Sequence, residues 1–166
     1  MQLMLDYHKP KELKMNKVTN NIVILPLIEK HIDEIMQIEN SLKNHIYSKN
    51  NLLDALNNKN YNILVAKKDN EIIGYISVCF VKNSNIDIES IVVKENYRKN
   101  GVATSLLNNI FIFAKSINVK DIFLEVRASN TPAINLYLKN RFKKISIRKK
   151  YYTDNLEDAI ILKKEL

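Results

Sequence analysis

The chain has 166 residues, a single Cys and 26 Lys or Arg residues against 18 Asp or Glu residues, which gives a formal net charge of +8. This length and a hydrophobic content of 46% suit one globular domain, whereas one Cys excludes a disulfide-stapled chain and two glycines exclude a collagen-like chain. No apolar run reaches the roughly 18 to 20 residues of a membrane-spanning helix, and charged residues interrupt the N-terminus, so we expect a cytoplasmic protein with neither a membrane span nor an export signal.

Residues 1–20 lack hydrophobic periodicity and contain Pro10. We therefore expect a poorly ordered N-terminal extension before a single domain over residues 21–166. Within that domain, apolar and β-branched runs predict strands over 21–27, 61–67, 72–81, 86–93, 121–127, 142–150 and 158–166. The turn chemistry of Asp69-Asn70 predicts a hairpin between the second and third strands.

Four helices are predicted between these strands. The first covers residues 28–39, the second follows Ser48 as N-cap, and the third covers residues 102–114. The fourth begins at Thr131, where a Thr N-cap precedes Pro132. The order predicts one mixed α/β (α+β) domain with four helices and a central mixed sheet of about seven strands.

Gly101 stands where a polar loop leads into the third helix. The first turn of a helix exposes unpaired N–H groups at the positive end of the helix dipole, and glycine lets a ligand approach the backbone closely. The segment Arg98 to Thr104 therefore suits an anion such as a pyrophosphate, with Arg98 and Lys99 adding positive charge. The alternative is that Gly101 only ends the loop.

Two motifs resemble a known family. Arg98-x-x-Gly101-x-Ala103 resembles the pyrophosphate-binding signature of the GCN5-related N-acetyltransferases, the GNAT family. The downstream residues resemble the RimI-type branch, which acetylates the N-terminal alanine of a ribosomal protein; they are Leu124-Glu125-Val126-Arg127-Ala128-Ser129-Asn130, Ala133, Leu136, Tyr137, Phe142, Tyr151-Tyr152 and Glu157-Asp158-Ala159. The resemblance covers residues from about Ile22 to the C-terminus and is closest from Ile86 onward.

The resemblance implies a sheet that splays into a V between its fourth and fifth strands, with acetyl-CoA as co-substrate in the V. The backbone beside the V and the loop before the third helix would bind it, through Ile91, Val92, Val93, Arg98, Lys99, Asn100, Gly101, Val102, Ala103, Thr104 and Asn130. From the residues alone, Ile91 to Val93 are ordinary core residues and Asn130 is a loop residue that satisfies backbone groups.

The resemblance also implies two catalytic residues. Glu125 shares a strand face with Phe123 and Arg127, and this pattern alone indicates a Glu125–Arg127 charge pair. The resemblance implies instead that Glu125 is the general base, which is needed because only a neutral amine attacks a thioester. Tyr137 has the spacing of a core tyrosine, and the resemblance implies that it is the general acid for the departing thiolate.

Reference pKa values favour an α-amine as the acceptor. An α-amine with a pKa of about 7.7 to 8.0 is partly neutral at pH 7, whereas a Lys amine at about 10.4 is neutral in under one part in a thousand. Together with the resemblance, this predicts direct acetyl transfer in a ternary complex to a protein N-terminus, most closely the N-terminal alanine of a ribosomal protein. The alternatives are a small-molecule amine acetyltransferase of the same fold and a non-catalytic CoA-sensing or nucleic-acid-binding module.

Cys and His residues add no further chemistry to this prediction. Cys79 lies in an apolar strand, which predicts a small buried residue and not an acyl-carrying nucleophile. His8, His31 and His45 have no other ligand-type residues at metal-binding spacing, so we expect no metal.

Two positions depart from the family pattern. Arg141 stands where the family has Gly before Phe142, and we expect Asn140 to take the left-handed conformation that ends the helix. Ile46-Tyr47 replaces the usual Pro-aromatic pair between the first two helices, so we expect a different substrate groove.

A basic run follows the fourth helix and has no acid within it, namely Lys139, Arg141, Lys143, Lys144, Arg148, Lys149 and Lys150. A solvated strand face explains this run, and contact with the substrate protein or with the ribose phosphate of the co-substrate is the alternative. A nucleic-acid-binding surface needs aromatic residues for stacking among its basic residues. Stacking aromatics interleaved with these basic residues are lacking until Tyr151-Tyr152, so the sequence does not predict direct nucleic-acid binding.

Overall fold

The computed structural model describes residues 21–42 and 45–166, so the extension expected over residues 1–20, with His8, lies outside the described residues. The strands are β1 Ile22–Pro26, β2 Tyr61–Lys68, β3 Glu71–Phe80, β4 Asn85–Val93, β5 Asp121–Arg127, β6 Lys143–Tyr152 and β7 Glu157–Glu165. The α-helices are α1 Ile32–Asn40, α2 Lys49–Asn57, α3 Val102–Ser116 and α4 Thr131–Lys139, and 3-10 turns cover Glu29–His31 and Glu95–Tyr97. The strands and helices expected from periodicity are all present.

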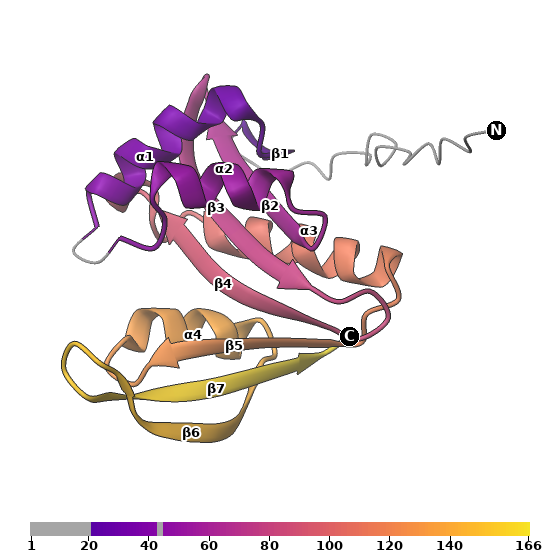
Figure 1. Cartoon of the computed structure of the whole chain (residues 1–166), viewed down its shortest axis with the longest axis vertical. Coiled ribbons are helices and arrows are strands. Elements are labelled where there is room, and N and C mark those ends of the chain that lie inside the picture. Colours follow the sequence, from indigo (N-terminus) through magenta and orange to yellow (C-terminus); the bar gives the residue numbers. More distant parts are fainter. Residues whose placement is uncertain (1–20, 43–44) are drawn as a thin grey trace.

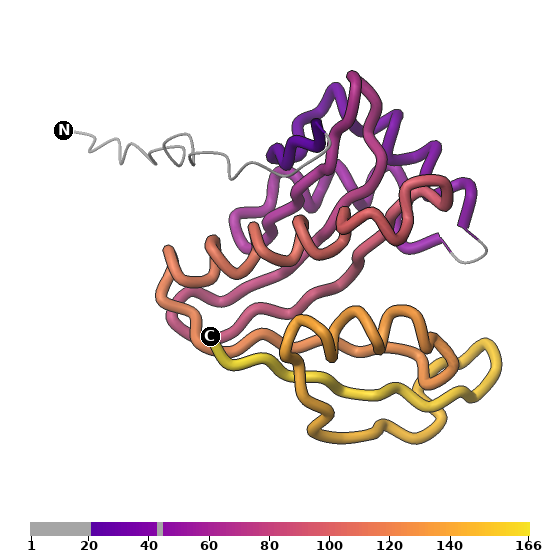
Figure 2. Tube along the Cα trace, turned by 180° about the vertical axis from the view of Figure 1, so that it is seen from behind, coloured from indigo at the N-terminus to yellow at the C-terminus, as the bar shows by residue number. Residues whose placement is uncertain are grey.

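Seven strands form one mixed sheet in the order β1-β2-β3-β4-β5-β7-β6. Neighbouring strands are antiparallel except β4 and β5, which run parallel because α3 carries the chain back between them. α1 and α2 cover one face of the sheet, and α3 and α4 lie on the other (Figures 1 and 2). No helix in the described part of the chain is long and apolar enough to cross a membrane.

Each face of the sheet has its own apolar core. Beneath α1 and α2, the buried residues include Ile35, Ile38, Leu52, Val65 and Tyr75. Beneath α3 and α4, they include Ile76, Ile86, Leu106, Ile110 and Tyr137. Because the two cores hold both faces of the sheet rigidly, the strand ends between them are fixed positions for functional groups.

The sheet opens between β4 and β5 because these strands pair over only part of their length. Their parallel register ends at Ile88↔Leu124. Beyond it, β4 remains paired with β3 up to Val93, and β5 remains paired with β7 up to Arg127. The ribbons of the two strands accordingly diverge in Figure 1, which confirms the V expected between the fourth and fifth strands.

A β-bulge lies where the two strands part. Ser77 pairs with Ser90, but the next residue of β3, Val78, pairs with Ile88, which leaves Glu89 as an extra residue on β4. A bulge bends the strand that carries it and increases its twist, so this one turns the end of β4 away from β5.

Both ends of α4 differ in detail from the expectation. Asn130, not Thr131, is the N-cap, because its side chain accepts a hydrogen bond from the Ala133 N–H at 3.2 Å. At the other end, Asn140 has a φ of −90° and Arg141 takes the left-handed conformation with a φ of +66°. The Asn140 amide donates to the Leu136 carbonyl at 2.8 Å, which holds Asn140 in the last helical turn and moves the left-handed residue one position on.

Candidate active site

The end of β4 beyond the last pair with β5 has an open backbone edge. Val92 contributes its side chain to the core beneath α1 and α2, and Ile91 and Val93 pack against the core beneath α3. Because β3 pairs with only one edge of these residues, alternate N–H and C=O groups on the other edge face the V. The side chains of this segment therefore serve the core while its backbone is open to a ligand.

The N-terminus of α3 is uncapped by any side chain. Gly101 is the N-cap residue with a φ of +78°, and the first N–H of the helix to find a carbonyl is that of Ser105, which donates to Gly101 at 2.9 Å. The three N–H groups before it, those of Val102, Ala103 and Thr104, precede the helical hydrogen-bond ladder. The Cβ of any residue built at Gly101 would have nothing within 4 Å, so there is open space for an anion beside these N–H groups.

Basic residues surround this helix end. Arg98, Lys99 and Asn100 are all exposed in the loop before Gly101. The Arg98 side chain also donates through Nε to the Val93 carbonyl at 3.1 Å, which ties the loop to the end of β4. The predicted pyrophosphate segment and the predicted pantetheine segment therefore lie next to each other.

Glu125 projects from β5 on the same face as Phe123 and Arg127, as the strand alternation predicts. Its carboxylate accepts a hydrogen bond from Arg148 of β6, and its side chain is 28% exposed. Hydrogen bonding to Glu125 raises the pKa of Tyr151, so that phenol remains protonated beside the carboxylate. The Glu125–Arg127 pair that strand alternation alone indicates is absent, because each of the two residues has another partner.

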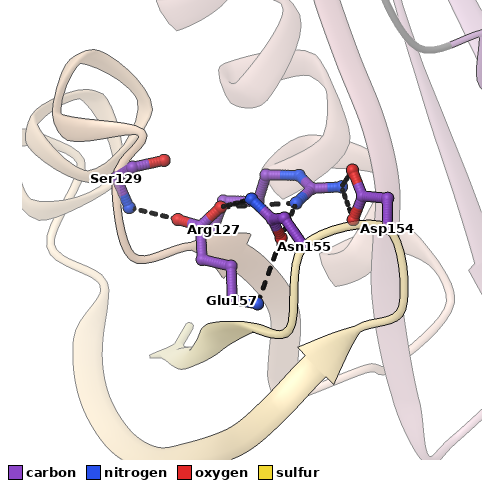
Figure 3. Close-up of polar contacts among 5 residues, drawn as sticks. All are labelled: Arg127, Ser129, Asp154, Asn155 and Glu157. Carbon is purple, nitrogen blue, oxygen red and sulfur yellow. Dashed lines mark hydrogen bonds and ion pairs between the residues drawn. The ribbon is translucent and has the colours of Figure 1, made fainter.

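Arg127 instead organises the turn between β6 and β7. Its guanidinium donates two hydrogen bonds of 3.0 Å to Asp154 and one of 3.3 Å to Glu157, and Glu157 also accepts from the Ser129 N–H at 2.6 Å (Figure 3). The hydrogen bonds from Ser129, with smaller contributions from Asn155 and Arg127, lower the pKa of Glu157 to about 2. This network holds the β6–β7 turn against the end of β5, beside Glu125.

Tyr137 of α4 is a buried tyrosine, as its spacing predicts. It packs edge-on against Phe142 with the ring centroids 5.5 Å apart. Burial, together with the nearby Tyr152, raises the pKa of Tyr137, so its hydroxyl is a proton donor and not a phenolate. The side-chain oxygen of Asn130 accepts the N-cap hydrogen bond of α4, and the two N–H groups of its side-chain amide can donate to a ligand.

Two acidic residues that our sequence analysis did not single out lie on the same face as Glu125. Asp87 pairs across the sheet with Phe123, and Glu89 follows on the bulge. Burial raises the pKa of Asp87, the carboxylates of Glu125 and Glu89 raise it further, and a hydrogen bond from Asn85 opposes them. The signal in the sequence is the alternation of acids with isoleucines over Ile86 to Glu89.

Cys79 is half-buried and not fully buried as expected, because it lies near the end of β3 opposite Asp87. Burial and the carboxylates of Glu89 and Asp87 raise the pKa of the Cys79 thiol to about 11. A thiol with this pKa is a poor nucleophile at neutral pH. Within residues 21–42 and 45–166, no group of three His, Cys, Asp or Glu side chains has the geometry to hold a metal ion.

The basic run over Lys139 to Lys150 lies largely on β6, an edge strand whose residues are all exposed except Tyr152. Arg148 pairs with Glu125, and Lys149 pairs with Asp158 at 2.7 Å. Lysines on an edge strand discourage pairing with other chains. The solvated strand face is the interpretation that this position favours.

This chain is similar to known proteins in sequence and in structure. The chain is 36% identical over 147 residues to the N-alpha-acetyltransferase of Saccharolobus solfataricus (strain ATCC 35092 / DSM 1617 / JCM 11322 / P2), which covers 81% of this chain and 87% of that protein. The crystal structure of the ribosomal-protein-S18-alanine N-acetyltransferase from Escherichia coli matches with a TM-score of 0.78 and 25% identity, covering 87% of this chain and 93% of that one. A GNAT family acetyltransferase from Elizabethkingia anophelis with acetyl-CoA bound matches with a TM-score of 0.70 and 26% identity, covering 88% and 99%.

The opened sheet, the helix that begins beside it and these similarities define an N-acetyltransferase. The model of the acetyltransferase (GNAT) family matches residues 30–142, and the chain belongs to that family.

Proposed function

We propose that the protein transfers the acetyl group of acetyl-CoA to the N-terminal α-amine of a protein, and that the N-terminal alanine of a ribosomal protein is its substrate. The observation that carries the proposal is the opening between β4 and β5, which has a free backbone edge on one side and the Glu125 carboxylate on the other. The names of the relatives support both an N-terminal amine and a ribosomal protein as acceptor.

The residues beside the opening suit acetyl-CoA. When bound, acetyl-CoA supplies a thioester that is activated toward an amine. The backbone of Ile91 to Val93 offers hydrogen bonds to the amides of a pantetheine arm, and the N–H groups of the first α3 turn offer hydrogen bonds to a pyrophosphate. Arg98 and Lys99 add positive charge, and Asn130 has amide N–H groups free to donate.

Glu125 would act as the general base. An incoming α-ammonium must lose a proton before its nitrogen can form a bond to the thioester carbon, and the Glu125 carboxylate lies where the strands part. Asp87, whose pKa is raised by burial, lies on the same face. Arg148 forms an ion pair with the Glu125 carboxylate.

Tyr137 would act as the general acid. The thiolate that departs from the thioester needs a proton, and a phenol kept protonated by burial is a suitable donor. Cys79 remains a thiol at neutral pH, which favours direct transfer from thioester to amine over an acyl-cysteine intermediate.

Intact-mass analysis of peptides after incubation with acetyl-CoA tests this function. The set comprises Ala-first, Ser-first and bulky-first peptides together with an α-blocked peptide that contains an internal Lys. We expect one acetyl group on the α-amine of the Ala-first peptide, less on the Ser-first peptide, and little on the others, because a Lys amine is rarely neutral at pH 7. Preference for the blocked Lys peptide over the Ala-first peptide, or no acetylation of any peptide in the set, would overturn the proposal.

A further inference from the structure

An open pocket of about 470 Å³ lies beside the V, between α2 and the bulge of β4. Its described lining residues come from three regions, namely Ile46 and Tyr47 before α2, Asn51, Asp54, Ala55 and Asn58 on or just after α2, and Tyr61 and Glu89 on the sheet. Two of these are acids and none is Lys or Arg, although the chain as a whole has 26 Lys or Arg residues against 18 acids. The charge of the pocket is therefore opposite to that of the chain.

Glu89 is held in this pocket by two tyrosines. Tyr47 donates to one carboxylate oxygen at 2.6 Å, and Tyr61 donates to the other at 2.9 Å. The hydrogen bond to Glu89 is the main reason that the pKa of Tyr61 rises to about 12, so its hydroxyl stays protonated as the donor. The Cys79 thiol also hydrogen-bonds to Glu89. A carboxylate has roughly four acceptor positions, so Glu89 can still accept a hydrogen bond from a ligand.

The backbone of Tyr47 is held in place by the buried side chain of Glu39. Glu39, which is fully buried, accepts hydrogen bonds from the backbone N–H of Ile46 at 2.6 Å and of Tyr47 at 3.1 Å, and Tyr75 donates to its other oxygen. The segment that carries Tyr47 is therefore anchored to the core under α1. Because its neighbours are already in place, Glu89 loses little freedom when a ligand binds.

Glu89 takes no part in the ion pairs among the described residues. Three other acids near the V do have a cationic partner, since Glu125 pairs with Arg148, Glu157 with Arg127, and Asp158 with Lys149. Glu89 has hydrogen bonds that fix its direction and, within residues 21–42 and 45–166, no ion-pair partner. This combination suits a ligand that brings its own positive charge.

The register places Glu89 next to the reacting groups. Ile88 and Leu124 are the last pair between β4 and β5, so Glu89 and Glu125 are the first residues on either side of the V. An extended peptide advances about 3.3 to 3.6 Å per residue. If the acceptor amine is at Glu125, the side chains of the next two residues are within reach of the pocket.

We propose that Glu89 and its pocket bind a cationic side chain, Lys or Arg, at the second or third residue of the acceptor, and so select which N-termini are acetylated. This inference rests on the proposed function, because it takes a protein N-terminus as the acceptor. It adds a charge requirement beyond the first residue. Glu89 acts here as a specificity residue, while the amine reacts at Glu125.

Peptides that differ at one residue test the inference. Ala-first peptides with Lys, Gln or Glu at the second position, and the same series at the third, are compared by kcat/KM with acetyl-CoA. We expect the wild-type protein to favour Lys over Gln by about tenfold at one of these positions, the effect of one charge-assisted hydrogen bond in a partly exposed site. Equal rates for Lys and Gln at both positions would overturn the inference.

Variants of Glu89 show whether this residue causes the preference for Lys over Gln. Glu89→Gln should lose the preference for Lys, and Glu89→Lys should reverse it in favour of Glu. Asp69→Asn, which removes one negative charge at the far end of β2, should keep the wild-type preference. A preference that survives in both Glu89 variants would contradict the inference, and thermal unfolding verifies that each variant is folded.

Calorimetry separates this inference from the proposed function. The same peptides are titrated into the protein saturated with CoA, so that binding is measured without turnover. If no α-amine is acetylated but Lys peptides bind more tightly than Gln peptides in a Glu89-dependent manner, the proposed function fails and the cation-binding pocket stands. If Ala-first peptides are acetylated with no charge preference, the function stands and the pocket assignment fails.

Discussion

Glu125 on β5 forms an ion pair with Arg148 on β6, across the intervening strand β7. The two side chains are 28% and 58% exposed, so water screens their attraction. An amine that is to give its proton to Glu125 has to take the place of the guanidinium. Because an exposed ion pair is weak, we expect this exchange to cost little, with Arg148 as a competitor that the proposed acceptor displaces.

Arg148→Gln should therefore lower the KM for the acceptor peptide, by up to about fivefold, since an exposed pair contributes at most about 1 kcal/mol. The value of kcat should change little, because Glu125 remains in place. Lys149→Gln is the matched control on the same strand, since Lys149 pairs with Asp158 and not with Glu125. A rise in KM for Arg148→Gln alone would instead show that Arg148 helps to bind the acceptor.

Glu125→Gln and Tyr137→Phe should affect the reaction differently. Without the base, the rate should fall most at low pH and recover as pH rises toward the pKa of the amine, because free amine then forms unaided. Without the phenol, kcat should fall by about 10² to 10⁴ at all pH values below the pKa of the thiol while the Kd for acetyl-CoA is kept. Rate–pH profiles and calorimetry measure both effects, and wild-type profiles in both variants would refute the mechanism.

Gly101→Asp should weaken the binding of acetyl-CoA at the N-terminus of α3, because a carboxylate there repels a pyrophosphate. Asn is nearly the same size as Asp and also tolerates the left-handed backbone of Gly101. Gly101→Asn therefore controls for the volume of the new side chain and for backbone strain. We expect calorimetry to give a Kd at least about tenfold weaker for Asp than for Asn. Equal Kd values for the two variants would show that the pyrophosphate does not bind at the N-terminus of α3.

Glu157 should make stability depend on pH. Its pKa is about 2 in the folded chain against an ordinary value of 4.5, so the folded state favours the carboxylate. The resulting stabilisation is fully present above about pH 4.5 and is lost as pH falls toward 2. Urea unfolding between pH 6 and pH 3, chosen as roughly the range that spans the ordinary pKa, should show a smaller loss for Glu157→Gln than for wild type.

In the same measurement, Arg127→Met should lose less stability between roughly pH 6 and pH 3 than wild type and more than Glu157→Gln. The reason is that the hydrogen bonds from Ser129 contribute more than Arg127 to the low pKa of Glu157. If Glu157→Gln and wild type lose stability in parallel, the network in Figure 3 does not determine the acid sensitivity of the fold.

Arg141→Gly should stabilise the protein. Arg141 has a φ of +66°, where a residue with a Cβ costs about 1 to 2 kcal/mol, while the added freedom of glycine in the unfolded chain costs about 0.4 to 1 kcal/mol. The balance is a gain of up to about 1.6 kcal/mol in the free energy of unfolding, or about 0.8 kcal/mol from the middle of each range. Arg141→Ala keeps the strained backbone and is the control, so equal stability of the Gly and Ala variants would contradict this account.

Local patterns were sufficient for the elements and for part of the site. Periodicity located the strands and helices, Ser48 was identified correctly as an N-cap, and the Asp69-Asn70 turn has the two left-handed residues that its chemistry predicts. The same local rules misplaced the cap of α4, because Asn130 and Thr131 are both good N-caps and only the backbone decides between them. The expected site roles of Glu125 and Tyr137 stay predictions.

By itself, the sequence determined the order of the elements, the alternation that puts Glu125 on one face of β5, and the glycine that begins α3, because each depends on neighbours within a few residues. The tertiary structure decided which side chains hydrogen-bond to the acids beside the V. Arg148 reaches Glu125 from 23 residues away, and Tyr47 reaches Glu89 from 42 residues away. The bulge that points Glu89 toward Tyr47 and Tyr61 results from the register between β3 and β4, which depends on the packing of both faces of the sheet.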